Sequence, residues 1–136
     1  MPDCCLTEGL LQALRGLECT PVKADQHYLN VRRGEECMPY VIIQTNQTFG
    51  IRTSDAVEII ENVRIVGYFS FDKPEQANQW HGLVQSWLFV ADCVSLDNCG
   101  CFCLRSAPSL QMTASDRGYQ VTATFRGQYS PSEMSS

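Results

Sequence analysis

Three cysteines at alternate positions, Cys99, Cys101 and Cys103, are the strongest candidates for chemistry in this sequence. Alternate residues of a strand lie about 6.6–6.8 Å apart, which is the far end of the range for disulfides, and their parallel side chains aim poorly at each other. A metal site needs a Cys-x-x-Cys pair or further ligands, which Cys37 and Cys93 supply only if the fold brings them close. We therefore expect no disulfide and no metal, and predict three small buried apolar groups on one sheet face.

The remaining reactive side chains form no catalytic pattern. His81 lies beside Trp80 at the boundary of a helical apolar stripe, and no serine or cysteine is placed next to it as a nucleophile. Glycine-rich phosphate-binding loops are absent. Glu58 and Glu61 are expected on a solvated face, with a pore lining or a contact across a subunit boundary as the alternative. The sequence thus predicts no catalytic residue and no cofactor, and hence a protein that is not an enzyme.

The composition points to a chain that is partly covered by neighbours. Charged residues are only 18% of 136 residues, against about 25% in typical domains. A net charge of −5 argues against a nucleic-acid-binding patch, because an acidic surface repels DNA. No signal peptide and no apolar run of about 18 residues is present, so we expect no membrane contact and a chain that folds in the cytosol with reduced thiols.

In the first half, leucine spacing predicts a helix over residues 4–17 with Asp3 as its N-cap. A long polar connection follows over residues 18–39, with one short extended piece at residues 27–32. Residues 40–44 are β-branched or apolar on both faces and predict a central strand. Residues 46–56 are polar and predict a long loop or a hairpin arm.

The second half reads more clearly. Residues 61–71 predict a long strand, which could begin near Val57, and Asp72 is expected to cap a helix over residues 73–89. Residues 99–104, 110–114 and 119–129 predict further strands, the last two joined by a turn, with a frayed tail at residues 130–136. We therefore predict one α+β domain spanning residues 1–136: a single mixed or antiparallel sheet with two helices packed on one face.

This order of elements resembles the tail-terminator (tail-completion) proteins of long-tailed bacteriophages. The stretches that carry the resemblance are residues 10–17, 39–44, 63–71, 74–88 and 116–129, above all the helix after the long strand and the closing hairpin. The resemblance implies a homo-hexameric ring in the neck of the virion, assembled in the host cytoplasm. Such a ring would cap the tail tube protein, contact the head–tail connector protein, and leave a bore through which DNA passes without specific binding.

For this assembly we expect contacts from the loop at residues 46–55 and from strand edges at residues 58–64 and 120–128. A solvated loop seldom needs apolar residues such as Phe49 and Ile51, and arginine and tyrosine are favoured at interfaces. The candidate interface residues are Phe49, Ile51, Arg52, Glu58, Glu61, Arg64, Arg126 and Tyr129.

Two alternatives stay open. One is another structural protein of the neck or tail, such as a head-completion or tube-like subunit. The other is a small cytosolic α+β enzyme or ligand-binding module, which a deep pocket with converging titratable groups would favour.

Overall fold

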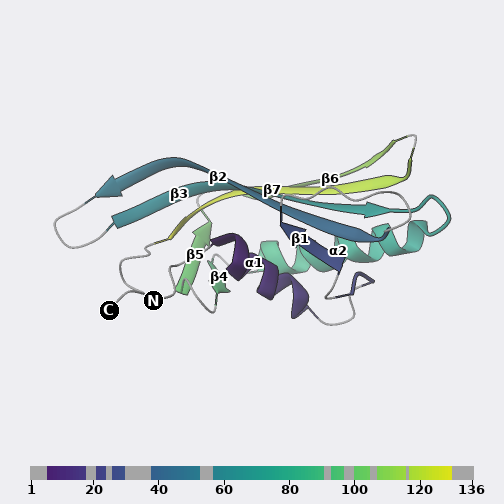
Figure 1. Cartoon of the computed structure of the whole chain (residues 1–136), viewed down its shortest axis with the longest axis horizontal. Helices are drawn as coiled ribbons and strands as arrows, with labels where there is room; N and C mark the ends of the chain where they lie inside the picture. Colours follow the sequence, from purple (N-terminus) through teal and green to yellow (C-terminus); the bar gives the residue numbers. More distant parts are fainter. Residues whose placement is uncertain are drawn as a thin grey trace.

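The computed structural model describes residues 6–17, 21–23, 26–29, 38–52, 57–90, 93–96, 100–104, 107–115 and 117–129. Two helices and seven strands lie in this part of the chain (Figure 1). In chain order they are α1 (Leu6–Arg15), β1 (His27–Leu29), β2 (Tyr40–Arg52), β3 (Val57–Phe69), α2 (Pro74–Val90), β4 (Cys93–Leu96), β5 (Gly100–Leu104), β6 (Ser109–Ala114) and β7 (Tyr119–Tyr129). The predicted α+β class is confirmed.

The strands form one mixed sheet. Their order is β1-β2-β3-β7-β5-β4, and β6 also pairs with β7. Only β1 and β2 run parallel, and the other pairs are antiparallel. β7 has β3 along one side, while β6 pairs with its first half and β5 joins it near Gly127 and Gln128. The last described strand is therefore the one to which most of the sheet is attached.

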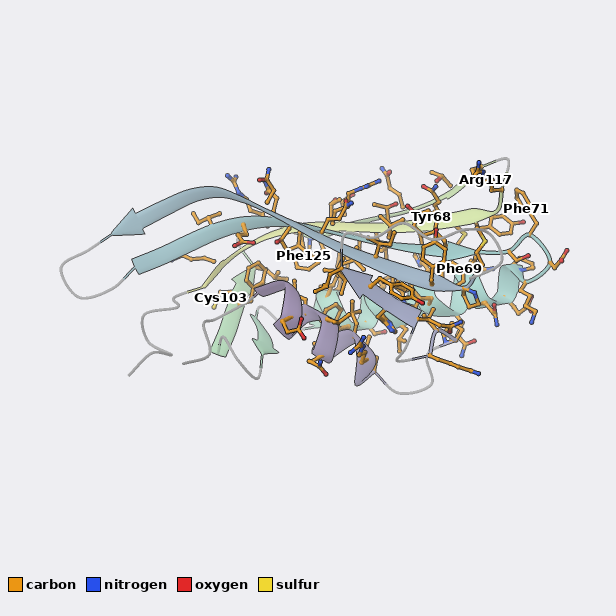
Figure 2. All side chains as sticks on the ribbon, viewed as in Figure 1. Tyr68, Phe69, Phe71, Cys103, Arg117 and Phe125 are labelled. Carbon is orange, nitrogen blue, oxygen red and sulfur yellow. The ribbon has the colours of Figure 1, made fainter. Side chains whose placement is uncertain are left out.

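Both helices cover the same face of the sheet (Figure 1), as the single apolar stripe on each predicts. Odd-numbered residues of β3, of β7 and of β2 before its irregularity point to this helical side, because a Cβ at Gly67 of β3 would meet Trp80 of α2. Ile43, Ile65 and Ala123 lie opposite one another on this side and are all fully buried. Figure 2 shows Phe69 and Phe125 on the same side. The core consists of these residues with Leu10, Leu11, Leu14, Val22, Val41, Val63, Ala77, Trp80, Val84, Leu88, Phe102 and Val121.

Trp80 brings α2 close to the sheet at Gly67. A Cβ at position 67 would lie 3.0 Å from ring carbons of Trp80 and 2.7 Å from Cε2 of Phe69. Trp80 is fully buried, whereas Trp87 is half-buried against the core. The absence of a side chain at Gly67 therefore lets the indole lie directly on the strand.

For residues 46–52 the alternative of a hairpin strand is confirmed and the loop interpretation is wrong, whereas residues 53–56 lie outside the described residues. β2 continues to Arg52 and pairs with β3 along its whole length, with an irregularity between Gln47 and Phe49. Polar residues such as Asn46 and Gln47 fit a strand here because the register pairs them with Asn62 and Glu61 of β3. β3 begins at Val57 and ends at Phe69, two residues before the predicted end.

The predicted start of the second helix is one residue off. Pro74 is the first helical residue, which places Lys73 rather than Asp72 at the N-cap. Lys73 N donates to the Ser70 carbonyl (3.1 Å), and Gln76 N donates to the Lys73 carbonyl (3.1 Å). The Asp72 side chain is exposed and accepts no hydrogen bond from the residues that the structure describes.

The prediction of a buried cysteine face is wrong at Cys103. Phe102 takes the buried side of β5, and alternation turns Cys103 to the exposed side, where its thiol forms no disulfide. β4, which pairs Cys93 with Cys103, was not predicted. Cys99 and the side chain of Cys101 lie outside the described residues, as do Asp3, Cys37, most of the predicted connection and the tail 130–136.

A candidate subunit interface on the outer face of the sheet

The face of the sheet turned away from the helices is called the outer face here; it carries the even-numbered residues 40–46, 60–68 and 120–128. One end of it is aromatic and dry. The ring of Tyr40 stacks on Tyr68 at 4.7 Å and meets Tyr28 edge-on at 6.3 Å. Tyr40 and Val66 are each 1% exposed. Tyr40 and Val66 are therefore covered within the chain, while Tyr28 and Tyr68 are half-buried.

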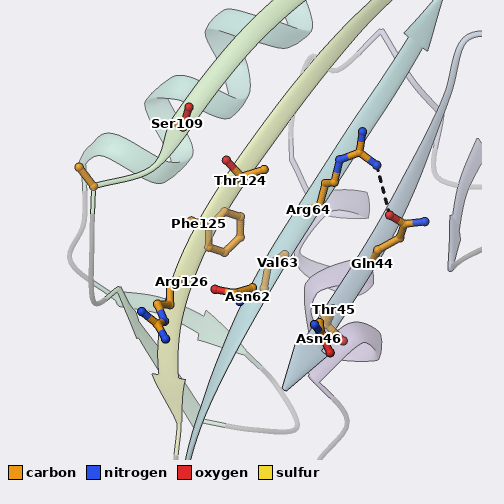
Figure 3. A pocket seen from close by; sticks show the side chains of 11 residues that line it. Gln44, Thr45, Asn46, Asn62, Val63, Arg64, Ser109, Thr124, Phe125 and Arg126 are labelled. Carbon is orange, nitrogen blue, oxygen red and sulfur yellow. Dashed lines mark hydrogen bonds between the residues drawn. The ribbon is translucent and has the colours of Figure 1, made fainter. Parts of the chain in front are cut away.

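Beyond Ile42 the outer face becomes polar and hollow. A cavity of about 710 Å³ lies over β2, β3 and β7 and reaches the start of β6 (Figure 3). We call it the polar trough. Its lining residues are Gln44, Thr45, Asn46, Asn62, Val63, Arg64, Ala107, Ser109, Thr124, Phe125 and Arg126.

Strand register gathers these residues from distant parts of the sequence. Arg64 lies between Gln44 of β2 and Thr124 of β7, and Asn62 lies between Asn46 and Arg126. Nη1 of Arg64 donates to Oε1 of Gln44 at 3.4 Å, the dashed line in Figure 3. Two rows of polar side chains thus cross three neighbouring strands at the floor of the trough.

The trough is basic within an acidic chain. Arg64 and Arg126 contribute two guanidinium groups, and the described lining residues include no carboxylate, although the chain carries a net charge of −5. Arg126 is exposed and hydrogen-bonds to no residue that the structure describes. Each guanidinium offers five N–H donors in a planar fork that matches the oxygens of a carboxylate or phosphate. The trough is therefore equipped to bind an anionic group.

The same lining offers little for catalysis. Its described residues supply amides, guanidinium groups and the hydroxyls of Thr45, Ser109 and Thr124, with no histidine, cysteine or carboxylate to act as a base. A hydroxyl without an adjacent base is a weak nucleophile. What the arrangement can do is hold and orient a partner through charge and hydrogen bonds.

The second candidate surface is the far end of the β2–β3 hairpin, called the hairpin arm here (residues 49–52 and 57–60). In Figure 1 it extends past both helices and past β4 and β5. The register brings Phe49 next to Ile60, Ile51 next to Glu58, and Tyr129 next to Ile59. Five of the predicted interface residues, namely Phe49, Ile51, Arg52, Glu58 and Tyr129, therefore have their backbones at this one end.

The other three predicted interface residues lie elsewhere. Arg64 and Arg126 are both exposed in the trough, whereas Glu61 is 8% exposed and lies on the helical side of the sheet opposite Gly127. The predicted strand-edge contacts are wrong for β3, because β2 and β7 occupy both of its edges, and largely wrong for β7, whose edges pair with β3, β5 and β6. Contacts from these strands must use faces instead of edges.

Sequence reasoning missed Gln44, Asn62 and Thr124 as site residues. Asn62 and Thr124 stand at polar positions of alternating strands, which is the ordinary pattern of a solvated face, and Gln44 is the polar last residue of the apolar run 40–44. The available signal was that Asn62 and Thr124 each lie two residues from an arginine and that Gln44 begins a run of amides and hydroxyls, but only the register shows that these positions adjoin.

Within the described residues, no group of three or more histidines, cysteines or carboxylates could hold a metal ion. No helix in that part of the chain is both long and apolar enough to span a bilayer.

Comparison with known proteins gives one kind of likeness. No family model and no curated protein matches this sequence. Among solved structures, a chain of "Virion of native gene transfer agent (GTA) particle" has a similar fold, with a TM-score of 0.61 at 13% sequence identity. The match covers 92% of this chain and 94% of that one. At this identity the likeness is one of fold: the sheet and its two helices occur, almost end to end, in a chain of that particle.

Proposed function

We propose that this chain is a structural subunit of a phage-like particle, and within it a tail-terminator subunit. The observation that carries the proposal is the nearly coextensive match to a chain of a gene transfer agent virion, 92% of one chain against 94% of the other. The likeness therefore extends over the sheet and both helices, nearly end to end in the two matched chains.

The tail-terminator role rests on the order of elements and on the two separate surfaces of the chain. A closed ring of identical subunits with more than two members needs two different, complementary surfaces on each subunit. The polar trough is a candidate for one such surface, and the hairpin arm is a separate surface that can contact another neighbour. A hexameric ring would cover the last layer of the tail tube and end its growth, because a closed ring offers no further equivalent surface for stacking.

In this proposal one side of the ring contacts the tail tube protein and the other the head–tail connector protein, with an open bore for DNA. The net charge of −5 suits a passage through which DNA must slide. Lysine and arginine contacts to phosphates would hold the DNA in a salt-dependent way. The lining of the trough, which offers binding groups without a base, supports an interaction role over an enzymatic one.

The test is the length of the tails in particles that lack this chain. If the chain is a terminator, tails grow beyond their normal length and stay unattached to heads. Loss of a tube-like subunit would instead leave particles without tails. Loss of a head-completion subunit would leave tails of normal length that are not attached to the closed heads. Electron cryomicroscopy of complete particles should place six copies between tail tube and connector. Normal particles without the chain, or turnover of a small molecule in the trough, would overturn the proposal.

A further inference from the structure

We propose that the polar trough binds the start of α2 of a neighbouring copy, so that Asp72 and Glu75 of one subunit pair with Arg64 and Arg126 of the next. This deepens the proposed function and rests on it, because it names the contact that would join subunits into a ring. The occupant is a second copy of this chain, and its recognition element is a pair of carboxylates on a projecting turn.

The turn before α2 and the first turn of α2 present one carboxylate each, and no described residue pairs with either. Asp72 and Glu75 are exposed, and neither side chain hydrogen-bonds to a residue that the structure describes. The turn is held by Lys73 N donating to the Ser70 carbonyl at 3.1 Å and by Asp72 N donating to Oγ of Ser70 at 3.3 Å. Pro74 at the first helical position stiffens it further. Asp72 is thus held in a hydrogen-bonded turn, and Glu75 is held in the first turn of α2.

The distance between the two arginines is similar to the distance between the two carboxylates. Arg64 lies opposite Thr124, and Arg126 is two residues further along β7, so the arginines are diagonal neighbours about 7–8 Å apart on one face. Asp72 and Glu75 are three residues apart at a helix start, where such a spacing brings Cβ atoms to about 5–6 Å. Long arginine side chains span the difference, so each guanidinium can reach one carboxylate.

An exposed aromatic ring accompanies these carboxylates. Phe71 is 43% exposed, although its ring packs edge-on against Tyr119 at 5.1 Å, and Figure 2 shows it at the end of the molecule. Large exposed apolar side chains are favoured where a surface becomes covered. A neighbour seated over Asp72 would also shield Phe71, which adds apolar burial to the ion pairs.

The charge inventory favours a second copy over nucleic acid as the occupant. The described lining of the trough offers two cations, enough for two carboxylates, whereas double-stranded DNA carries about one negative charge per 1.7 Å of its axis. The rest of a chain with net charge −5 would repel that polyanion. Trough and turn are also different surfaces, one on the outer face and one at the start of a helix on the opposite side, which is what a ring-forming contact requires.

Charge reversal on each surface tests the contact. The double variants R64E/R126E and D72K/E75K are compared with the parent by sedimentation velocity at low ionic strength, where screening is weakest. We expect each variant alone to self-associate at least tenfold more weakly, because groups of like charge then face each other across the contact. An equimolar mixture should regain the parent's association, because each reversed trough then meets a reversed turn of the other variant. The quadruple variant should regain it alone.

Matched controls use exposed charges outside both surfaces. Lys23→Glu lowers the net charge, as R64E/R126E does, and Glu8→Lys raises it, as D72K/E75K does. Both controls should leave association unchanged. Circular dichroism of each variant checks that its monomer is folded. Added DNA of random sequence should bind the parent no better than R64E/R126E.

A second measurement locates the contact. In the variant R64K/R126K the trough carries primary amines, which a carbodiimide joins to a carboxylate as an amide while the reagent takes up the water that is lost. Mass spectrometry should find intermolecular links from positions 64 and 126 to Asp72 or Glu75. Links only to other carboxylates, a mixture no better than its components, a parent that stays monomeric at high concentration, or DNA binding that depends on Arg64 and Arg126 would each overturn the contact.

These outcomes separate the contact from the proposed function. If the chain lies at the tail–head junction of particles but the reversed variants assemble like the parent, only the contact fails. If the mixture restores association but the chain is absent from particles or lies away from the tail axis, the contact stands and the proposed function fails.

Discussion

The ring of Phe102 on β5 occupies the space in front of Gly127 on β7, where any Cβ would overlap ring carbons Cε2 and Cζ. β5 pairs with β7 at only two positions, Cys103 with Gln128 and Leu104 with Gly127. Phe102 is fully buried and meets Phe125 edge-on at 6.0 Å and 72°. Packing of this one ring, more than the backbone ladder, therefore attaches β5 to the sheet.

Replacing Gly127 by alanine should lower the free energy of unfolding by about 1–3 kcal/mol, because the added methyl overpacks a core that Phe102 already fills. Urea unfolding followed by circular dichroism measures this. The control is Gly82→Ala on α2, where a Cβ meets nothing within 4 Å and where alanine should stabilise the helix by up to about 1 kcal/mol. Equal effects of the two substitutions would contradict the placement of Phe102.

Trp80→Ala should cost about 3–5 kcal/mol, since the indole is fully buried between α2 and the sheet. The matched change on the same helix is Phe89→Ala, whose ring is 51% exposed and whose loss should change stability by no more than about 0.5 kcal/mol. Both are read from thermal and urea unfolding curves. A small effect at position 80 would mean that α2 does not lie on the sheet through this residue.

Cys103 should react with a thiol reagent in the folded protein, because its side chain is exposed and in no disulfide. Mass mapping of the label before and after unfolding checks this. Cys103→Ser should leave stability within about 0.5 kcal/mol of the parent, as for other exposed positions. Protection of Cys103 until the chain unfolds would place its thiol inside the protein, as the sequence alone predicts.

Ser115→Ala should cost about 0.5–1.5 kcal/mol, because the hydroxyl makes two hydrogen bonds in the β6–β7 turn. Its Oγ donates to the Gly118 carbonyl at 3.1 Å and accepts from Arg117 N at 3.3 Å. Ser109→Ala, at the exposed start of β6, serves as the control and should be nearly neutral. An unchanged midpoint for Ser115→Ala would show that the backbone bond from Ser115 N to the Gly118 carbonyl suffices for the turn.

The sequence predicts most of the scaffold because its periodicities are local. Alternation over residues 119–129 defines β7, and apolar spacing through Trp80 and Val84 defines α2, both confirmed. The end of β2 is less evident: residues 46–50 lack apolar alternation, and they become a strand because β3 offers a backbone partner all along. β4 and the parallel pairing of β1 also depend on partners distant in sequence.

The candidate site was only half predictable for the same reason. Arg64 and Arg126 could be selected by residue type, but nothing local shows that they are diagonal neighbours or that Gln44 reaches Arg64. Glu61 illustrates the opposite error. A glutamate in a strand is expected to be exposed to solvent. Glu61 is nevertheless buried, because it lies on the helical side of the sheet opposite Gly127.

The position of β7 also has a consequence for biosynthesis. Since β3, β5 and β6 all pair with this strand, a nascent chain that has not yet released residues 119–129 from the ribosome has no partner for one long edge of β3. The sheet is therefore completed only after synthesis has passed this segment. Chains that terminate early expose an unpaired edge of β3, which promotes aggregation. In the cell, such truncated chains should be removed as misfolded protein.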